Sequence, residues 1–508
     1  MKRSRAATLP LITKPLFEAG VQCSKRLHLD FHAKRAPARR SQQEELVALG
    51  QRLVELASQA FPRGTDLQGV AKEDAMERTR EEIASGRPGA LFHAVFQGGG
   101  VEVVCDIALV VGPNEVDLFE VKAGTFLKPR HLTDVALQVH AVEACGIQVK
   151  SASILHLDER YVHDGSRDYP VHKLFRSEDV TSRARNQLSR VAEQVQSFQS
   201  VVEDEGMLDL PTGTWCRTPL PCPHLERCSS EGPEHPLFEL PHLASVVETK
   251  LHENAIESID QLKPSQTGLS AGQRRAVRAI QEDRLIVEPF VRDELRDIDD
   301  PVCFVHVLWH LDPLPRFAQS RPWQKIPYAW SSHRFEQSGR SYHRSFVSAT
   351  QDDPRDETIK TLAEEIRDAG TVVVYDRGWD ERFRALMDDL PDRKADLRAL
   401  LGAPILELGN LIYHGVYHPA FHGMFDVERV RGILAANLPA PSGEPIEGLD
   451  GMSDDLPDED AAAEAYQKIL AKRTRGTTRE KLGEQLTALV SHRSASLVAV
   501  QRLLRGCD

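Results

Sequence analysis

The order of apolar segments predicts an α/β chain, because strand patterns and helix patterns alternate in two separate stretches. From residue 72 to residue 157 the order is helix, three strands, helix and strand, and a second strand-and-helix stretch runs from residue 302 to residue 401. A loop rich in proline and cysteine ends the first stretch. A chain of 508 residues has room for two or three domains. We therefore expect an α/β domain at residues 1–235, a helical linker module at 236–300 and a second α/β domain at 301–508.

Composition and charge exclude several classes of protein. No apolar run approaches the roughly 20 residues of a membrane span, and the basic start lacks the apolar segment of a signal peptide, so we expect a cytoplasmic protein without membrane contact. The net charge of −13 argues against a surface coated for nucleic-acid binding. The first forty residues are nevertheless basic, with ten lysines and arginines, Lys14 among them, against two acids. A basic arm there either is simply solvated or contacts phosphate.

The first domain has recognisable element boundaries. Leucines at helical spacing predict a helix over residues 42–61, which Pro62 ends, and a second helix over 72–85 ends at Gly86. Alternating and β-branched residues then predict a meander of three strands. The three expected strands of the meander are 90–96, 101–111 and 116–122. They are followed by a helix at 131–144, a strand at 149–157 and a helix at 187–202.

The second and third strands carry a group of charged residues. Asp106 lies early in one strand, and Glu120 and Lys122 lie at the end of the next. Residues two apart in a strand point to the same face, so Glu120 and Lys122 should project together, and the hairpin should bring Asp106 beside them. Two carboxylates and an ammonium on one sheet face can hold a hard divalent cation and orient a water.

This order of elements, with an Asp followed by Glu-Val-Lys, resembles the PD-(D/E)XK nuclease core, and most closely its RecB-type branch, which includes the CRISPR-associated iron–sulfur exonucleases. The resemblance implies that Asp106, Glu120 and the backbone carbonyl of Val121 bind Mg²⁺ or Mn²⁺, and that Lys122 is catalytic. It also implies a glutamine facing the site from the following helix, and Gln138 fits that place.

Further site residues follow from the same comparison. Asp134 lies one helical turn before Gln138 on the same face. Many members of this branch add an upstream histidine or glutamate as a metal ligand. His93 on the first strand is the first candidate, and Glu82 on the preceding helix is the second. Read without the resemblance, a histidine in an apolar strand is a structural residue.

Four cysteines form the second group. Cys216, Cys222 and Cys228 recur every six residues just after the core, and Cys23 lies far upstream. Thiolates at such spacing in a cytosolic protein indicate a metal or cluster. The RecB-type branch places one cysteine before the core and three after it around a [4Fe–4S] cluster, which implies a structural staple here. The alternatives are Zn²⁺ at the same four residues, a Cys₃His site that uses His224, and free thiols.

The third domain should be α/β, because buried strands at 302–311 and 371–375 flank a helix at 356–369. It resembles the C-terminal RNase H-like (DnaQ-type) domain of bacterial proteins that carry this nuclease in front. The segments that carry the resemblance are PLPRF, RPWQKIPYAWSSH, TVVVYDRGWDERF and VYHPAFHGMF. His306, Leu308 and Arg493 stand where that family has metal-binding acids, so we expect an RNase H-like fold without its catalysis.

Together these features predict a metal-dependent deoxyribonuclease. The resemblance implies single strands or ends of DNA as substrate, genome defence or DNA repair as the setting, and binding of substrate or a protein partner by the C-terminal domain. The alternative is a catalytically silent nucleic-acid-binding or scaffold subunit of a larger complex.

Overall fold

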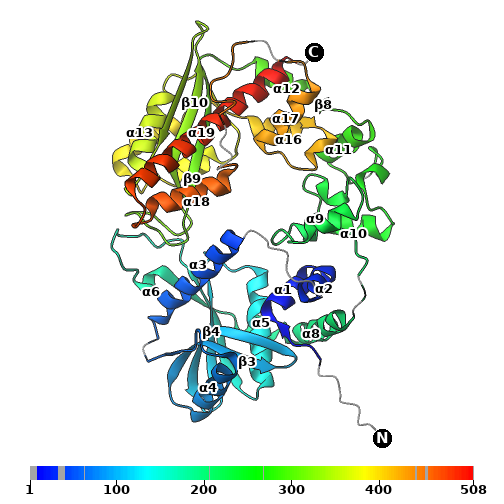
Figure 1. Cartoon of the computed structure of the whole chain (residues 1–508), viewed down its shortest axis with the longest axis vertical. Coiled ribbons are helices and arrows are strands. Elements are labelled where there is room, and N and C mark those ends of the chain that lie inside the picture. The colour runs from blue at the N-terminus through cyan, green and yellow to red at the C-terminus, as the bar shows by residue number, and fades with distance from the viewer. Residues whose placement is uncertain are drawn as a thin grey trace. The chain divides into compact units, whose positions relative to one another are not determined.

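The computed structural model divides the chain into two compact units. Unit 1 comprises residues 1–232 and 313–323, and unit 2 comprises residues 233–312 and 324–508 (Figure 1). The structure describes residues 9–32, 40–61, 63–204, 206, 208–266, 268–440, 443–451 and 456–506, with side chains 40–45 left out. Much of the basic start, including Lys2, Arg3, Arg5 and residues 34–39, therefore lies outside the described residues.

A seven-stranded mixed sheet forms the middle of unit 1. Its strand order is β2-β3-β4-β5-β6-β7, and β1 pairs with β4 in parallel. The central pairs β3–β4 and β4–β5 are antiparallel, whereas β5–β6 is parallel. The strands are β1 (Ile12–Thr13), β2 (Thr65–Asp66), β3 (Gly89–Gly98), β4 (Val101–Gly112), β5 (Glu115–Lys122), β6 (Gln148–Leu157) and β7 (Phe175–Asp179).

The meander is the one expected from the sequence, with β3 longer by three residues and β4 and β5 longer by one residue each. Asn114 adopts a left-handed φ of 56° in the turn between β4 and β5, as asparagine does readily. The helices of unit 1 are α1 (Lys14–Gln22), α2 (Ser24–His32), α3 (Arg40–Ser58), α4 (Lys72–Ser85), α5 (Pro129–Ala144), α6 (Val171–Leu174), α7 (Thr181–Arg185), α8 (Leu188–Glu203), α9 (Leu225–Ser230) and the 3₁₀ turn η1 (Thr214–Cys216).

Each face of this sheet has its own hydrophobic core. On one face, residues of α1, α5 and α8 such as Phe17, Val139 and Phe198 pack against inward residues of the central strands. On the other, Leu53 and Leu56 of α3 pack with Ile107 and neighbouring residues. The sheet is therefore sandwiched between two helical layers, which is why its strands are apolar on both faces.

Two adjacent helices at the start of unit 1 were not expected. The alternation of Leu27, Leu29 and Phe31 reads as a weak strand, yet these residues belong to helix α2. The N–H of Cys23, between α1 and α2, donates to the carbonyl of Ala19 (2.9 Å). Packing against α8 explains why this segment is a helix and not a strand, because Leu27 is fully buried in the same hydrophobic core as residues of α8.

Residues Pro313–Trp323 join the strands β9 and β10 of unit 2, yet they belong to unit 1. Leu314 packs on the core beneath α3. Four hydrogen bonds hold this arm: Tyr169 Oη to the Pro315 carbonyl (3.1 Å), His163 N–H to the Ser320 carbonyl (2.9 Å), Gln319 N–H to the His163 carbonyl (2.7 Å) and Trp323 Nε1–H to the Ala123 carbonyl (2.6 Å). The expected boundaries need correction here, because PLPRF is not part of the third domain.

Unit 2 is built on a five-stranded sheet of order β11-β10-β9-β12-β13. The first three strands are antiparallel, and β12 and β13 continue parallel to β9. The strands are β9 (Val302–Leu311), β10 (Lys325–Phe335), β11 (Ser341–Val347), β12 (Thr371–Val374) and β13 (Ile405–Glu407), with a separate pair of β8 (Ile286–Val287) and β14 (Val416–Tyr417).

The helices of unit 2 cover this sheet and extend beyond it. They are α10 (Ser245–Glu253), α11 (Ala271–Gln281), α12 (Pro289–Arg296), α13 (Arg355–Glu365), α14 (Trp379–Arg384), α15 (Lys394–Leu401), α16 (Leu408–Gly415), α17 (Val427–Asn437), α18 (Glu459–Leu470) and α19 (Gly476–Arg505). The 3₁₀ turns are η2 (Leu237–Glu239), η3 (Ile259–Gln261), η4 (Pro391–Arg393) and η5 (Pro419–Phe421).

The segment expected as a linker module, residues 236–300, is part of unit 2. Leu237, Val277 and Val291 are fully buried in one core together with β9, α16 and α19. The polar helical pattern of this segment indicated a separate module, but its few apolar residues point into the shared core. The expected mixed α/β class is confirmed by the two sheets and their helices.

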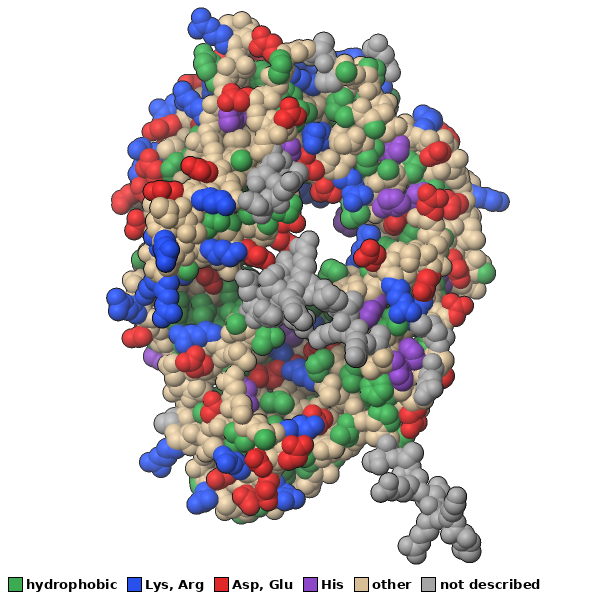
Figure 2. Space-filling model, in the orientation of Figure 1, with side chains coloured by type: hydrophobic (Ala, Val, Ile, Leu, Met, Phe, Trp, Pro, Cys, Tyr) green, Lys and Arg blue, Asp and Glu red, His purple; other side chains and the backbone are tan. Residues whose placement is uncertain are grey.

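The surface agrees with the composition. Charged side chains of both signs are interspersed over the visible face of each unit (Figure 2). Within the described part of the chain, no helix has both the length and the apolarity needed to cross a membrane.

Removing the ring of Phe198 should destabilise unit 1. Phe198 is 5% exposed, and its ring lies edge-on to that of Phe17, with centroids 5.3 Å apart. Phe198→Ala should lower the free energy of unfolding by about 3–5 kcal/mol, because the cavity cannot close between α1 and α8. Calorimetry measures this change. Phe126→Ala is the control, since Phe126 is 60% exposed. Equal effects of the two changes would contradict this packing.

Candidate active site

Charged side chains from four elements meet on the face of the unit 1 sheet that α5 covers. Asp106 comes from β4, Glu120 and Lys122 from β5, and Asp134 and Gln138 from α5. Lys14, from the first turn of α1, completes the group. Figure 1 shows α1 and α5 on this side of the strands. The fold thus collects residues from positions 14 to 138 at one place.

Two ammonium groups bridge two carboxylates in this cluster. Lys122 Nζ lies 2.6 Å from Glu120 Oε1 and 2.5 Å from Asp134 Oδ2. Lys14 Nζ lies 2.8 Å from Glu120 Oε1 and 2.9 Å from Asp134 Oδ1. Positive and negative groups therefore alternate around a small ring. The expectation that Glu120 and Lys122 project to the same face is confirmed by their direct contact.

Neutral donors fix the remaining carboxylate oxygens. Gln138 Nε2 donates to Glu120 Oε2 at 2.5 Å, in a fully enclosed contact. The backbone N–H of Val121 donates to Asp106 Oδ2 at 2.8 Å, which joins β5 to the side chain from β4. Glu120, Asp134 and Gln138 are at most 6% exposed. These carboxylates are held in place before any ligand arrives, which is a requirement of a working site.

Burial and neighbouring charges set the protonation of the cluster. Burial opposes ionisation of Glu120, but Lys122 and Lys14 outweigh it and hold the pKa of Glu120 well below its usual range. Burial favours the neutral amine of Lys122, yet Glu120 and Asp134 raise its pKa to about 12. Burial and then the charge of Glu120 raise the pKa of Asp106 to about 8. The site therefore holds two permanent cations and one carboxylate that ionises with difficulty.

His93 lies on β3 between two residues that pair with β4, Phe92 with Ile107 and Ala94 with Cys105. Its backbone has a φ of 57°, a left-handed conformation within the strand. Its Nδ1 lies 2.9 Å from Asp66 Oδ1, so the carboxylate fixes the ring. Such carboxylate–histidine pairs often orient a metal-binding imidazole. Glu82, the second upstream candidate, instead lies 3.6 Å from Arg87 near the surface.

Lys14 is the residue that sequence reasoning missed. The sequence pattern counts it among the basic residues of the first forty and predicts no function for it. The signal was local: a lysine just before Pro15 in the first turn of a helix is unfavourable for the helix dipole. A cation placed there is explained by partners outside its own helix, here Glu120 and Asp134.

The four cysteines of the second group come together at the other end of α1. Cys23, Cys216, Cys222 and Cys228 line one cavity. Gln22 Nε2 donates to the carbonyls of Trp215 (2.7 Å) and Leu220 (2.9 Å), and so ties α1 to the cysteine loop. Burial raises the pKa of the Cys216 thiol to about 11.

His224 also lines this cavity. Its Nε2 lies 2.8 Å from Asp30 Oδ1, and the pair connects α2 to the cysteine loop. The Cys₃His alternative stays a prediction beside the four-cysteine site.

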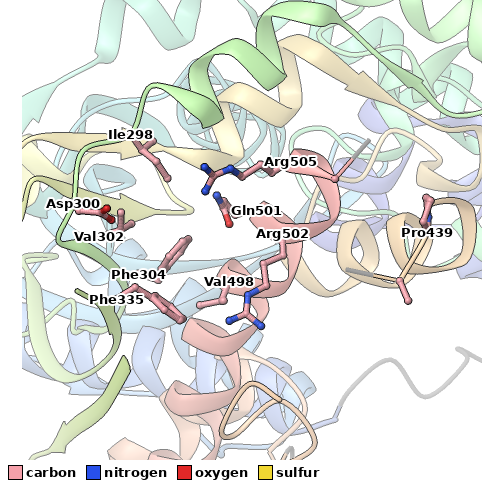
Figure 3. Close-up of a pocket in the computed structure, with 12 residues that line it drawn as sticks. Ile298, Asp300, Val302, Phe304, Phe335, Pro439, Val498, Gln501, Arg502 and Arg505 are labelled. Carbon is pink, nitrogen blue, oxygen red and sulfur yellow. The ribbon is translucent and has the colours of Figure 1, made fainter. Parts of the chain in front are cut away.

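Unit 2 has a pocket of about 620 Å³ between the end of α19 and the beginning of the sheet (Figure 3). Arg502 and Arg505 line one side and Phe304 and Phe335 the other. The Arg502 guanidinium lies 5.4 Å from the Phe335 ring centroid and donates to the Glu444 carbonyl. Among the described residues that line it, Asp300 is the single carboxylate, so the pocket suits binding rather than metal-assisted catalysis.

Comparisons with known proteins give two findings. A family model described as "Domain of unknown function (DUF2779)" matches residues 311–426. Among solved structures, the chain is similar to an alkaline exonuclease from Laribacter hongkongensis, with 13% identity and a TM-score of 0.16, over 39% of this chain and 94% of that one. A TM-score this low carries no structural argument. No curated protein matches the chain.

The raised pKa of Asp106 predicts a pH-dependent stability in metal-free buffer. The folded protein holds a proton on Asp106 up to about pH 8, whereas the unfolded chain releases it near its ordinary value of 3.8. The stability that this bound proton gives to the folded protein is therefore lost as the pH rises from 3.8 to about 8. Asp106→Asn cannot ionise, so its stability relative to the natural chain should increase from pH 5 to pH 8, by at most about 1.4 kcal/mol per pH unit. Urea denaturation with chelator present measures this difference, and a constant or falling difference contradicts the assignment.

Proposed function

We propose that unit 1 is a metal-dependent nuclease that hydrolyses DNA phosphodiesters, with single strands or ends as substrate. The observation that carries this proposal is the convergence of Asp106, Glu120, Lys122 and Gln138, the same residues that the sequence pattern singles out. Structural ion pairs are common, but few of them bring three carboxylates and two lysines together against a buried glutamine.

The residues present fit a hard divalent cation. Asp106 and Glu120 offer carboxylate oxygens and Val121 a backbone carbonyl, the donor types that Mg²⁺ and Mn²⁺ prefer. His93, which Asp66 orients on the neighbouring strand β3, is a further ligand in this proposal. A bound Mg²⁺ or Mn²⁺ would polarise the phosphate and acidify a water molecule.

The side chains of the site have separate tasks in this scheme. Lys122 stabilises the negative charge that grows on the phosphate oxygens in the transition state. Lys14 adds a second positive charge from α1; it shares Glu120 Oε1 with Lys122 and contacts the other oxygen of Asp134. Gln138 holds one oxygen of Glu120, and the N–H of Val121 holds one oxygen of Asp106, so neither carboxylate needs to reorient during the reaction.

We also propose that Cys23, Cys216, Cys222 and Cys228 hold a structural [4Fe–4S] cluster. Their position around one cavity supports a shared ligand. Thiolates hold both iron–sulfur clusters and Zn²⁺. The order of one cysteine before the core and three after it, which resembles the RecB-type branch, favours the iron–sulfur cluster in this proposal.

In unit 2 we propose an RNase H-like domain that binds substrate or a protein partner without catalysis. Three antiparallel strands followed by two parallel ones support that fold. At the expected acidic positions, Leu308 is buried and Arg493 lies 2.8 Å from Glu459 and 2.9 Å from Glu428. Because the guanidinium is paired with both of these acids, they are poorly suited to binding metal ions. Genome defence or DNA repair is the setting we infer for the whole chain.

The same network also allows a second candidate function. If unit 1 does not hydrolyse any nucleic acid, the chain would be a catalytically silent nucleic-acid-binding or scaffold subunit of a larger complex. Unit 2 is already catalytically silent in this proposal. The two functions differ in one measurable property, which is cleavage that depends on Lys122.

Cleavage should depend on Lys122. With end-labelled single-stranded DNA and Mg²⁺ or Mn²⁺, Lys122→Ala should reduce the rate about 100-fold or more, because one charge that stabilises the transition state is lost. Lys150→Ala is the matched control, since Lys150 lies on β6 of the same sheet, 46% exposed at its side chain. No cleavage of any DNA or RNA, or cleavage unaffected by Lys122→Ala, would reject the nuclease.

The cluster proposal is tested by colour and metal content. Protein purified anaerobically should be brown, with about four iron atoms per chain, and Cys23→Ser should lose both the colour and the iron. Cys145→Ser is the control, because Cys145 is exposed and stands outside the group. A colourless protein that holds one zinc ion at these cysteines would overturn the proposal.

A further inference from the structure

Unit 2 contains a second group of metal-ligating side chains, distinct from all the residues discussed above. His235 lies just before the turn η2, Glu239 is the last residue of that turn, and His422 follows the turn η5. One donor atom from each lies within 4.8 Å of the other two. His235 and Glu239 are 8% and 7% exposed, whereas His422 is partly open to solvent.

Hydrogen bonds fix the backbone of the first segment, and the second segment approaches it closely at Gly423. The carbonyl of His235 accepts the N–H of Ile259 at 2.8 Å, and the N–H of Glu239 donates to the Pro236 carbonyl at 3.0 Å. Gly423 has a φ of 70°, and a Cβ there would lie 2.4 Å from the Glu239 carbonyl oxygen. The close approach places His422 beside Glu239 although 183 residues separate them.

Both imidazoles direct Nδ1 at the same carboxylate. His235 Nδ1 lies 3.4 Å from Glu239 Oε2, and His422 Nδ1 lies 3.1 Å and 3.2 Å from the two carboxylate oxygens. The two rings are stacked, with centroids 5.3 Å apart and planes at 27°. The nitrogens and the carboxylate thus face a common point.

Two explanations account for this geometry. Hydrogen bonds from a charged imidazole to a carboxylate are short, about 2.7–2.9 Å, and neutral N–H···O bonds extend to about 3.2 Å. Ligands of a tetrahedral metal with bonds of about 2.0–2.1 Å lie about 3.3–3.4 Å apart. The observed 3.1–3.4 Å is longer than a charged hydrogen bond and close to the ligand spacing. Two imidazole nitrogens and one carboxylate oxygen are also a donor set that zinc accepts.

We propose that His235, Glu239 and His422 bind one Zn²⁺ ion, with a solvent molecule completing its coordination on the open side of His422. The ion connects the segment that begins unit 2 to the VYHPAFHGMF segment, for which the nuclease proposal has no use. It therefore acts as a tie within unit 2, and it is independent of the site in unit 1.

The test is the zinc content of four full-length proteins after gel filtration. The natural chain and His414→Ala should contain one more equivalent of Zn²⁺ than His422→Asn and Glu239→Gln, whatever the cysteines hold. His414 is the control because it is an exposed histidine on α16 of the same unit. Asparagine is chosen at position 422 because His422 has a φ of 48°, which asparagine tolerates.

A melting experiment gives a second readout. Added Zn²⁺ should raise the melting temperature of the natural chain and of His414→Ala, and have no such effect on His422→Asn or Glu239→Gln. Glu239→Gln keeps the shape and an acceptor oxygen, so it should still fold if His422→Asn does not. Equal zinc content in the natural chain and Glu239→Gln, or equal stabilisation by Zn²⁺, would show a hydrogen-bonded group only and overturn the proposal.

Discussion

The burial of Glu120 and Asp134 is the constraint on which the architecture of unit 1 depends. A carboxylate this deep in a protein is costly unless charged partners reach it. Lys122 arrives from the same strand as Glu120, but one lysine cannot compensate two acids. The second cation, Lys14, comes from α1, so the N-terminal helix must fold back onto the sheet before the cluster is neutral.

Helix α1 therefore has a structural importance beyond its nine residues. Lys14 at its beginning contacts the candidate active site, and Cys23 immediately after it lines the cysteine cavity. The helix rests on α8 through Phe17, and Gly20 leaves room for the Phe198 ring, which a Cβ would approach to 2.8 Å. In the proposed scheme, a cluster at Cys23 would fix one end of the helix and thereby the position of Lys14 at the other.

The two units treat buried charge differently. Unit 1 surrounds Glu120 and Asp134 with flexible lysines, whereas burial and the charge of Glu120 keep the pKa of Asp106 high. In unit 2, Arg493 of α19 binds Glu428 and Glu459 at once. A lysine can release a carboxylate to a metal ion more readily than a doubly paired, buried guanidinium can. This contrast supports the proposal that the metal-dependent chemistry belongs to unit 1.

The sequence by itself determined most of the local elements, apart from α1 and α2, and most residues of the proposed active site. The strand pattern placed Asp106, Glu120 and Lys122 on one hairpin, and the helical spacing placed Asp134 beside Gln138. Both predictions were possible because they depend only on the periodicity of residues close together in the chain. Tertiary structure alone decided the role of Lys14, the inclusion of residues 236–300 in unit 2, the attachment of Pro313–Trp323 to unit 1, and the meeting of His235 with His422. Each of these is a contact between segments far apart in the chain, and no local pattern encodes it, since such contacts form only when separate apolar faces bury one another.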